Sequence, residues 1–507
     1  MYGLVALTNA LLSLTMDGTP MSPIEEPFMS RREDVIPALT ALLGPTQVIS
    51  DAPHLALYRL DGLRPSRGYR DRQRLGVMPG CVVRPRRRAE VQALVQWANA
   101  AHMALVPYGG GTGLMGGAMA DGESVLIDFK DMADIVAIRR EDRHAVVQSG
   151  VVLSRLEDAL RVEGLTLGHD PWTVGIATVG GTISTNGLGY RGGQYGSMGE
   201  QVLGLEVVLP DGQVLRTRAV PKSSTGPDLT QLFIGAEGVF GLITEATLQV
   251  FPAPEAHALL AFTFPTFTHG FAAVAEMASV GLRPTLMELT EDFPTGDVAR
   301  SLIERAAGVS LYLGCEGFQG LVEAQRGRAV AICAHHGGKD LGEAAAHTFW
   351  NSRHRTAERF QQDRLQNLPH GILDTRPEAS FDYIHVALPT SQVLRYREDA
   401  LDLCQHQGIM VTQCGIWTRP ELFSMVLHNP SGQVEILADT VDRLLALAQD
   451  AGGSMEYCHG VGVRLAHLLA RELGTGTKIL SALKQVLDPD HLLNPGKLGL
   501  ESHVSDA

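Results

Sequence analysis

Cysteine, aromatic residues and positive charge are all scarce in this sequence. Its 507 residues include 6 scattered cysteines, 6% aromatic residues, and 42 Lys and Arg against 56 Asp and Glu, giving a net charge of −14. Scattered cysteines in a long chain favour reduced thiols over a disulfide framework. Net negative charge disfavours nonspecific binding to nucleic acid or to anionic lipid. We therefore expect no nucleic-acid partner.

Long apolar runs are also missing. No stretch approaches the roughly 18 apolar residues of a membrane-spanning helix. The mildly apolar segment Tyr2–Met16 has no preceding Lys or Arg and is interrupted by polar residues, which does not fit a secretory signal peptide. Asp17–Glu26 is rich in Pro, Ser and acidic residues. We expect a flexible leader over residues 1–28, no integral membrane segment and a cytoplasmic location.

Glycine, in contrast, is abundant and clustered. The segment Pro107–Ala118, PYGGGTGLMGGA, has six glycines within nine positions and follows a strand-like apolar run, Met103–Val106. Glycine permits positive φ and leaves backbone N–H groups uncovered, so successive N–H groups can turn toward one anion. A pyrophosphate group suits such a loop, although a glycine-rich loop alone is equally consistent with a tight turn.

The same loop contains Gly111-x-Gly113-x-x-Gly116, the spacing of a Rossmann dinucleotide fingerprint. That fingerprint requires a helix directly after the glycines. Here the chain continues through Asp121-Gly122 into a second strand-like run, Ser124–Asp128. The order strand, loop, strand argues against an NAD-binding Rossmann domain.

Two further glycine-rich blocks follow, Thr173–Tyr195 and Gly235–Glu245. The ordered series PYGGGTGL, ATVGGTISTNGLG, VVLPDG, STGPDL and GAEGVFGLITEATL spans about 140 residues and resembles the FAD domain of the vanillyl-alcohol-oxidase/PCMH family. Near the C-terminus, Asp488–Lys497 resembles the closing motif of D-lactate and glycolate dehydrogenases, in which the chain returns to the flavin.

The resemblance implies an α+β fold. We expect a PCMH-type FAD-binding domain over residues 29–254, an α+β substrate or cap domain over 255–440, and a C-terminal helical segment over 441–507 that returns to the flavin. The alternation of strand-like and helix-like runs after residue 255 favours one antiparallel sheet covered by helices.

FAD is the implied cofactor. Family members with covalent flavin often carry a histidine at the first glycine loop, where this chain has Tyr108, so we expect noncovalent binding. The residues expected to contact FAD are Pro107, Tyr108, Gly109, Gly110, Gly111, Thr112, Gly113, Leu114, Pro171, Thr178, Gly180, Gly181, Ser184, Thr185, Gly187, Gly189, Glu237, Gly238, Gly241, Ile243 and Asn494.

Two residues are candidate catalytic groups. His459, in Tyr457-Cys458-His459-Gly460-Val461-Gly462, matches a histidine of D-2-hydroxyacid dehydrogenases and alkyldihydroxyacetone-phosphate synthases. Histidine suits a base because its pKa lies near the working pH. Arg353 matches a substrate-binding arginine of the dehydrogenases, and arginine pairs bidentately with carboxylates. The alternatives are a structural histidine at a turn and a solvated cationic helix face, and Arg355 is the substitute for Arg353.

The chain also departs from both families. Where the dehydrogenases carry metal ligands, it has Glu421–His428, and Cys458 replaces a glutamate, so that only His428 and Cys458 could ligate there. We therefore expect no metal. Relative to the synthases, Tyr457 and Cys458 replace two histidines, and the tyrosine expected over residues 422–428 is missing. The substrate arginine expected over 285–288 is also missing, and Arg283 is the one candidate to replace it.

The function predicted from these features is FAD-dependent oxidation of a hydroxyl-bearing carbon in a small anionic substrate resembling a 2-hydroxy acid, by hydride transfer to flavin N5. The first alternative is a redox-neutral FAD transferase similar to alkyldihydroxyacetone-phosphate synthase. The second is a flavin-binding protein that has lost catalysis. The electron acceptor and the oligomeric state stay open, with a homodimer among the arrangements considered.

Overall fold

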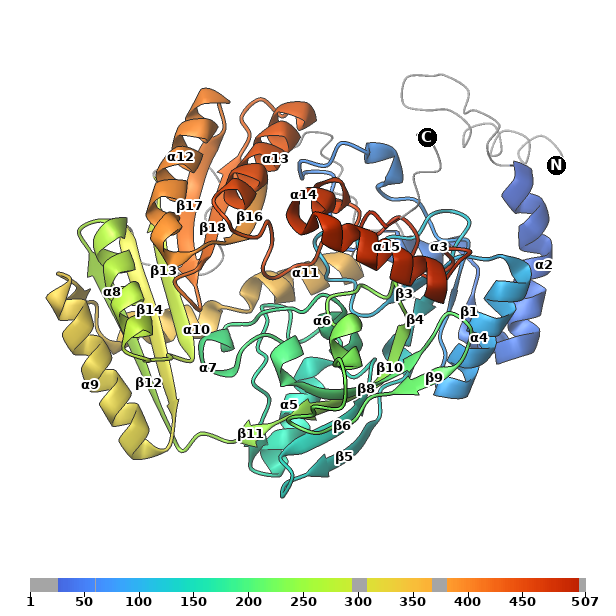
Figure 1. The fold of residues 1–507 in the computed structure, drawn as a ribbon, viewed down its shortest axis with the longest axis horizontal. Coiled ribbons are helices and arrows are strands. Elements are labelled where there is room, and N and C mark those ends of the chain that lie inside the picture. The colour runs from blue at the N-terminus through green and yellow to red at the C-terminus, as the bar shows by residue number, and fades with distance from the viewer. Residues whose placement is uncertain (1–25, 60, 294–307, 367–380, 501–507) are drawn as a thin grey trace.

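The structure is a computed structural model that describes residues 26–59, 61–293, 308–366 and 381–500 (Figure 1). The expected leader, residues 1–28, lies almost entirely outside this range. Its end does not coincide with a structural boundary, because helix α2 runs from Glu26 to Leu43. Short helix α3 (Ala52–Leu55) follows.

The first sheet has the order β1-β2-β4-β3, with β1 Val48–Ile49, β2 Cys81–Val83, β3 Leu105–Tyr108 and β4 Val125–Asp128. Strand β4 is parallel to both β2 and β3. Helix α4 (Arg88–Ala101) connects β2 to β3 and buries Val91, Leu94, Val95 and Ala98, the face predicted from helical spacing. The glycine loop joins β3 directly to β4 with no helix between them, so the loop is not a Rossmann loop.

The second sheet is antiparallel, with the order β5-β6-β10-β8-β9. The strands are β5 Ile135–Arg139, β6 His144–Gln148, β8 Val202–Val208, β9 Val214–Arg216 and β10 Leu242–Gln249. Strands β8 and β9 form a hairpin that turns at Pro210-Asp211-Gly212, residues typical of a tight turn. Helices α5 (Leu153–Val162), α6 (Val179–Ser184) and α7 (Gly192–Tyr195) lie between β6 and β8 in sequence, and β7 (Leu165–Thr166) pairs with β11 (Phe251–Pro252).

The third sheet is the seven-stranded antiparallel sheet that the alternation after residue 255 predicts. Its order is β15-β12-β14-β13-β17-β18-β16, and all its pairs are antiparallel. The strands are β12 Ala256–Phe264, β13 Leu286–Asp292, β14 Val309–Gly317, β15 Lys339–Asp340, β16 Phe381–Ala387, β17 Met410–Trp417 and β18 Leu422–His428.

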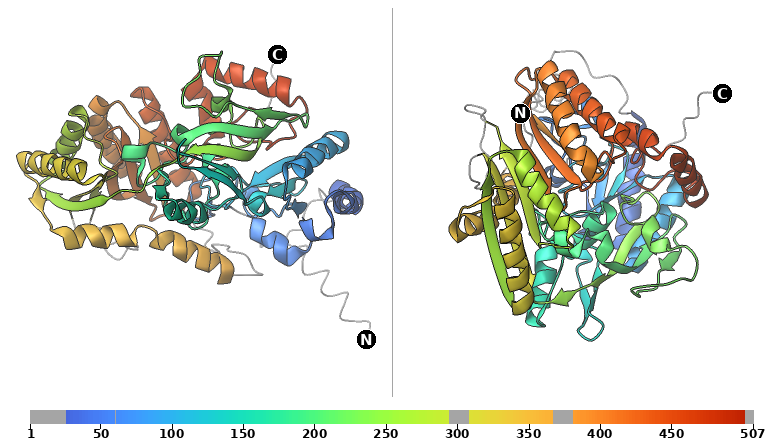
Figure 2. Two further views of the ribbon diagram at one scale, coloured as in Figure 1. Left: turned by 90° about the horizontal axis from the view of Figure 1, so that it is seen from below. Right: turned by 60° about the vertical axis from the view of Figure 1, so that its left-hand side comes forward.

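Helices cover this sheet. They are α8 Phe267–Ser279, α9 Gln319–His335, α10 Glu343–Ser352, α11 Arg355–Gln366, α12 Val393–His406 and α13 Val434–Asp450. Figure 2 shows α10 and α11 on the side of the sheet opposite to α8 and α9. Residues alternate along a strand between the two faces. On β16, Ile384 and Val386 therefore join the hydrophobic core while Tyr383 and His385 face the other way.

The C-terminal part crosses back over the FAD-binding region, as Figure 1 shows for α14 (Leu469–Leu473) and α15 (Thr475–Leu487). Helix α14 begins at Leu469, after a 3-10 turn at Ala466–Leu468. Helix α13 packs on β16 and runs without interruption across residue 440, the predicted end of the substrate domain. Within the described residues, no helix is long and apolar enough to cross a membrane.

Candidate active site

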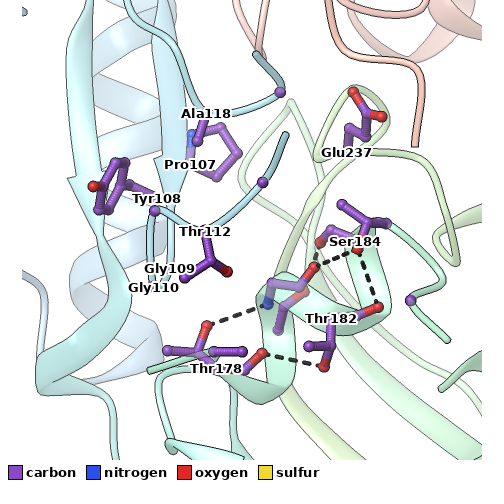
Figure 3. Close-up of a pocket in the computed structure, with 18 of the residues that line it drawn as sticks. Pro107, Tyr108, Gly109, Gly110, Thr112, Ala118, Thr178, Thr182, Ser184 and Glu237 are labelled. Atoms are coloured by element: carbon purple, nitrogen blue, oxygen red, sulfur yellow. Dashed lines mark hydrogen bonds between the residues drawn. The ribbon is translucent and has the colours of Figure 1, made fainter. Parts of the chain in front are cut away.

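One cavity, here called the flavin cavity, lies where the three glycine-rich loops meet. In Figure 3, the first loop (Pro107 to Thr112) lies on one side of the space, and Thr178 to Ser184 of α6 on the other. Glu237 comes from the third loop. The three loops are far apart in sequence, and the two smaller sheets bring them together.

Close backbone packing between the first and second loops explains two of the glycines. A Cβ at Gly109 would lie 2.3 Å from Thr178 Oγ1, and a Cβ at Gly110 would lie 2.5 Å from the carbonyl oxygen of Ile176. Real Cβ atoms do not approach other atoms so closely. These positions must therefore stay glycine for the two loops to form one wall.

The third loop is tied to the segment that carries His459. The Glu237 carboxylate accepts hydrogen bonds from the backbone N–H groups of Val461 (2.6 Å) and Gly462 (2.9 Å). Burial raises the pKa of Glu237 to about 7, although these two N–H donors oppose the shift. Any movement of this loop therefore also moves the backbone next to His459.

The C-terminal segment holds the loops of the flavin cavity together from outside the cavity. The side-chain amide of Asn494 donates to the carbonyl oxygens of Gly117 (2.9 Å) and Glu237 (2.6 Å), and its backbone N–H donates to that of Leu105 (2.8 Å). Lys497 Nζ donates to the carbonyl oxygen of Met119 (2.7 Å). The predicted return of the chain to the flavin region thus has a specific hydrogen-bonded form.

The structure brings nearly all of the predicted FAD contacts to this cavity. Two do not line it. Gly189 packs against the backbone of Asp170, where a Cβ would lie 2.6 Å from the carbonyl carbon, and Asn494 acts on the loops from outside. The other nineteen line it: Pro107, Tyr108, Gly109, Gly110, Gly111, Thr112, Gly113, Leu114, Pro171, Thr178, Gly180, Gly181, Ser184, Thr185, Gly187, Glu237, Gly238, Gly241 and Ile243.

Several lining residues were not predicted as contacts, and two of them indicate a polar occupant. Within the described residues, neither Ser149 Oγ nor either ring nitrogen of His169 has a hydrogen-bond partner, although all three atoms are buried. Burial lowers the pKa of His169 to about 4, so the ring is neutral and offers one donor and one acceptor. Buried polar atoms are normally satisfied. A long cofactor rich in hydroxyl, amide and phosphate groups fits this lining.

A second cavity of about 680 Å³, here called the substrate cavity, adjoins the first. The two share Leu114, Trp172, Cys458 and His459 as wall residues. Side chains of β13, β16, β17 and β18 face into it from the large sheet. His459 therefore stands between the two cavities, and its neighbours Tyr457 and Cys458 also line the substrate cavity.

His459 lies beside two groups that sequence reasoning did not select, Glu456 and His385. Its Nδ1 is 3.3 Å from a Glu456 carboxylate oxygen, and the ring centroids of His459 and His385 are 4.5 Å apart. Burial alone would lower the pKa of His459, but the Cys458 and Glu456 side chains hold it well above its ordinary value. Burial and the neighbouring His459 charge lower the pKa of His385 to about 3. Of the two imidazoles, His459 is therefore the stronger base.

His385, Glu456 and His459 also form a set of possible metal donors, whose ligand atoms lie within 4.8 Å of one another. Two imidazoles and a carboxylate are donors that suit Zn²⁺. Sequence reasoning considered only His428 and Cys458. His428 pairs with Phe381 and Met410 at the far end of β18, four residues beyond Ser424, the β-pairing partner of His385. The expectation that no metal binds stays a prediction.

Arg353 reaches the substrate cavity but is already engaged. It follows α10, and its Nε donates to Asp170 (3.0 Å) while Nη1 donates to the carbonyl oxygen of Trp350 (2.7 Å). Its guanidinium also lies 3.6 Å from the Trp350 ring centroid. Arg353 thus lines the substrate cavity, with part of its hydrogen-bonding capacity taken by protein groups, and its role in substrate binding stays a prediction.

Comparison with known proteins assigns this architecture. Residues 79–218 match the family described as FAD binding domain, and residues 253–498 match the family described as FAD linked oxidases, C-terminal domain. D-2-hydroxyglutarate dehydrogenase from Xanthomonas citri pv. viticola is 30% identical over 452 residues, covering 84% of this chain and 90% of that protein. The chain belongs to the FAD-linked oxidase family.

This FAD-linked oxidase has FAD as its cofactor, as the glycine loops predicted, and noncovalent binding is typical of the family. The probable mitochondrial D-lactate dehydrogenase of Danio rerio is 28% identical over 436 residues, covering 83% of this chain and 84% of that protein. Enzymatic oxidoreductase activity therefore follows from family membership.

Solved structures confirm the fold of this FAD-linked oxidase. p-Cresol methylhydroxylase superimposes with a TM-score of 0.73 at 18% identity, covering 94% of this chain and 98% of that one. Alkyldihydroxyacetonephosphate synthase superimposes with a TM-score of 0.70 at 21% identity, covering 95% of this chain and 87% of that one. The sequence resemblances to the PCMH family and to alkyldihydroxyacetone-phosphate synthases are therefore confirmed at the level of the fold.

Proposed function

We propose that this FAD-linked oxidase oxidises a hydroxyl-bearing carbon of an anionic substrate resembling a 2-hydroxy acid. The observation that carries the proposal is the position of His459, whose side chain lines both the flavin cavity and the substrate cavity. A group there is within reach of a hydroxyl whose carbon faces the cofactor. Named relatives that act on D-lactate and D-2-hydroxyglutarate support the substrate class.

Bound FAD supplies the acceptor for the hydride. The residues of this chain hold the substrate and move its proton. His459 is the proposed base, since an imidazole can take the hydroxyl proton as the carbon is oxidised. The Glu456 carboxylate is placed to orient the ring and to stabilise the imidazolium that forms.

The anionic group of the substrate requires cationic partners, and the substrate cavity has them. Among the described residues, four arginines line it, Arg64, Arg67, Arg353 and Arg359, against one carboxylate, Glu288. Arg353 is the anion clamp predicted from sequence. An unchanged substrate KM in Arg353→Ala would remove it from that role.

The second candidate function is a redox-neutral transferase resembling alkyldihydroxyacetonephosphate synthase. Its tyrosine acid/base is missing from residues 422–428, but Tyr383 and Tyr457 both lie beside His385 in the substrate cavity. Within the described residues, the buried Tyr457 hydroxyl lies near Ser424 but makes no hydrogen bond of good geometry. Tyr383 or Tyr457 is therefore placed to act in the position of the missing tyrosine, which supports this second candidate function.

The test is an anaerobic titration of the purified, FAD-loaded enzyme with D- and L-2-hydroxy acids, followed by the visible flavin spectrum. Bleaching by one enantiomer with release of the 2-oxo acid supports the oxidoreductase. An unbleached flavin across the panel contradicts it. The transferase then requires that an acylated dihydroxyacetone phosphate and an alcohol give the ether product, with release of the carboxylic acid and no net flavin reduction. The cytoplasmic location stays a prediction from sequence.

A further inference from the structure

A buried cluster with excess positive charge lies against the substrate cavity. Arg67 and Arg464 share one carboxylate, Asp382: Arg67 Nε donates to Oδ1 at 2.5 Å, and Arg464 Nη2 pairs with Oδ2. The side chains of all three residues are 3% exposed or less. Asp382 also accepts the backbone N–H groups of Gly68 and Tyr383. Two buried cations therefore face a single anion.

An uncompensated charge in the protein interior is costly unless it is paired and hydrogen-bonded. Of the two arginines, only Arg67 lines the substrate cavity, and its guanidinium lies 3.7 Å from the Tyr383 ring centroid. Within the described residues, its Nη2 is buried and has no hydrogen-bond partner. Arg464 faces away, and lines a different pocket near Asp442 and His467.

Arg67 Nη2 is one of several buried polar atoms at this cavity that have no hydrogen-bond partner among the described residues. Four more atoms around the same cavity are buried without a partner in the described part of the chain: Ser66 Oγ, Thr290 Oγ1, His385 Nδ1 and Tyr457 Oη. They come from four separate segments of the chain. Such convergence around one cavity indicates a binding site for a polar group, since native proteins leave few buried polar atoms unsatisfied.

An aromatic wall lines another part of the cavity. Trp172, Tyr190, Phe360, Phe381 and Trp417 line it, and Trp172 meets Phe360 edge to face at 6.3 Å between ring centroids. Part of the space adjoining Leu114 and Trp172 is shared with the flavin cavity. Even so, a volume of about 680 Å³ falls in the range of roughly 300–1,000 Å³ of sites that enclose ligands far larger than a two- or three-carbon acid.

We propose that Arg67 binds the carboxylate of the substrate and that the aromatic wall selects a carboxylate with a bulky, aryl-sized apolar body. This rests on the proposed function for the substrate's hydroxyl group, but the binding claim stands apart from turnover. Tyr383 connects the two ends of the site, because its ring contacts Arg67 and lies 5.7 Å, between centroids, from His459. The anion is thus held one ring away from the proposed base.

The assignment differs from the sequence prediction, which selected Arg353. Arg353 already donates to Asp170 and to a backbone carbonyl, whereas Arg67, which also lines the cavity, keeps one buried guanidinium nitrogen without a hydrogen-bond partner among the described residues. A guanidinium donor that already has a protein partner gains less from an anion than one that has none.

The first experiment measures binding without turnover. FAD-loaded enzyme is titrated with phenylacetate, phenylacetamide and acetate, and the Kd of each is taken from the perturbation of the flavin spectrum. We expect phenylacetate to bind at least about tenfold more tightly than the neutral amide, from the strength of charge-assisted hydrogen bonds. We also expect it to bind more tightly than acetate. Equal affinity for phenylacetate and phenylacetamide overturns the anion site.

The second experiment assigns the site to one residue. Arg67→Met should weaken phenylacetate about 10- to 100-fold while leaving phenylacetamide unchanged, and Arg67→Lys should recover part of the loss. Arg464→Met is the matched control, because it loses the same Asp382 partner outside the cavity. Arg353→Met tests the alternative, in which Arg353 binds the carboxylate. A loss in Arg353→Met with none in Arg67→Met overturns the proposal. If neither Arg67 variant folds, the wild-type comparison of phenylacetate with the amide still decides whether an anion site exists.

The third experiment separates this proposal from the proposed function. D- and L-mandelate and D- and L-lactate are tested for anaerobic flavin bleaching. Bleaching by mandelate faster than by lactate supports both ideas. Phenylacetate binding that depends on Arg67, with no bleaching by any hydroxy acid, supports the Arg67 site and contradicts the oxidation. Bleaching by lactate but not by mandelate overturns the bulky-substrate assignment.

Discussion

The flavin cavity and the substrate cavity adjoin each other but are built differently. The flavin cavity is made largely of backbone, from glycine, serine and threonine in three loops, each contiguous in sequence. The substrate cavity is made of charged and aromatic side chains from four strands and from segments near residues 64, 172, 353 and 457. The comparison shows that local chain pattern specifies the cofactor site, whereas sheet topology specifies the substrate site. The predictions below test that contrast, from the largest expected effect to the smallest.

Gly110→Ala should abolish flavin binding and with it all activity. The added Cβ would lie 2.5 Å from the Ile176 carbonyl oxygen, so the two loops must separate. Overpacking of this kind costs about 1–3 kcal/mol in stability. The flavin content of the purified protein measures the effect. Gly175→Ala is the matched control in the second loop, because nothing lies within 4 Å of its added Cβ. A full flavin complement in Gly110→Ala would contradict the backbone origin of this cavity.

His459→Ala should keep FAD but reduce it about 10²- to 10⁴-fold more slowly with substrate, the usual contribution of a general base. Stopped-flow absorbance under anaerobic conditions measures the rate. His428→Ala, on the same sheet but outside the substrate cavity, serves as control and should be close to wild type. An unchanged reduction rate in His459→Ala removes this residue from catalysis.

Glu456→Gln should shift the pH dependence of flavin reduction toward lower pH. Burial works against the charged imidazole, but Cys458 and Glu456 keep the pKa of His459 well above its ordinary value. The base must be neutral to act, so the wild-type rate should rise with pH as His459 loses its proton. The free energy of unfolding should change in the opposite direction to the rate. The contribution of the His459–Glu456 pair is fully present below the unfolded-state pKa of His459, about 6.5, and is lost as pH rises through the folded-state pKa.

The Glu456 variant is suitable because glutamine keeps an oxygen for the backbone. Glu456 Oε1 accepts the N–H groups of Tyr457 (3.0 Å), Cys458 (2.8 Å) and His459 (3.1 Å). Rate–pH profiles of wild type and variant, measured with the same substrate, give the comparison. Superimposable profiles would show that Glu456 does not control the proton on His459.

Tyr457→Phe should have the smallest effect on folding. Its buried hydroxyl lies near Ser424 but makes no hydrogen bond of good geometry within the described residues, so its removal should leave the free energy of unfolding unchanged or raise it by up to about 1 kcal/mol. Tyr396→Phe is the matched control, because Tyr396 Oη donates to the Leu444 carbonyl oxygen at 3.0 Å. Its removal should cost about 1 kcal/mol. Urea unfolding of both variants measures the difference, and equal losses would show that Tyr457 does have a protein partner.

Much of the FAD-binding region was predictable from sequence because its determinants are local. Glycine spacing, strand periodicity and the hairpin at Pro210-Asp211-Gly212 each act within a few residues. Nineteen of the predicted contacts accordingly line the flavin cavity. Gly189 shows the limit of such reasoning, since its lack of a side chain accommodates the Asp170 backbone instead of a ligand.

The substrate cavity was less predictable because its residues meet only through the order of strands in the large sheet. Arg67 lies in an irregular segment with no motif, and it reaches Asp382 across 315 positions in sequence. One local signal did exist. In Asp382-Tyr383-Ile384-His385-Val386, Tyr383 and His385 alternate with apolar residues, which places them together on the face that leaves the core. A polar aromatic stripe of this kind predicts a lined cavity.

The Asn494 hydrogen bonds have a consequence for biosynthesis. Residue 494 joins loops that were translated some 257 and 377 positions earlier, through the carbonyl oxygens of Glu237 and Gly117. While the ribosome is still making the large sheet, those two loops lack the hydrogen bonds that join them through Asn494. Cofactor capture should therefore wait until translation is almost finished, and nascent chains that stall before this point should be released without flavin.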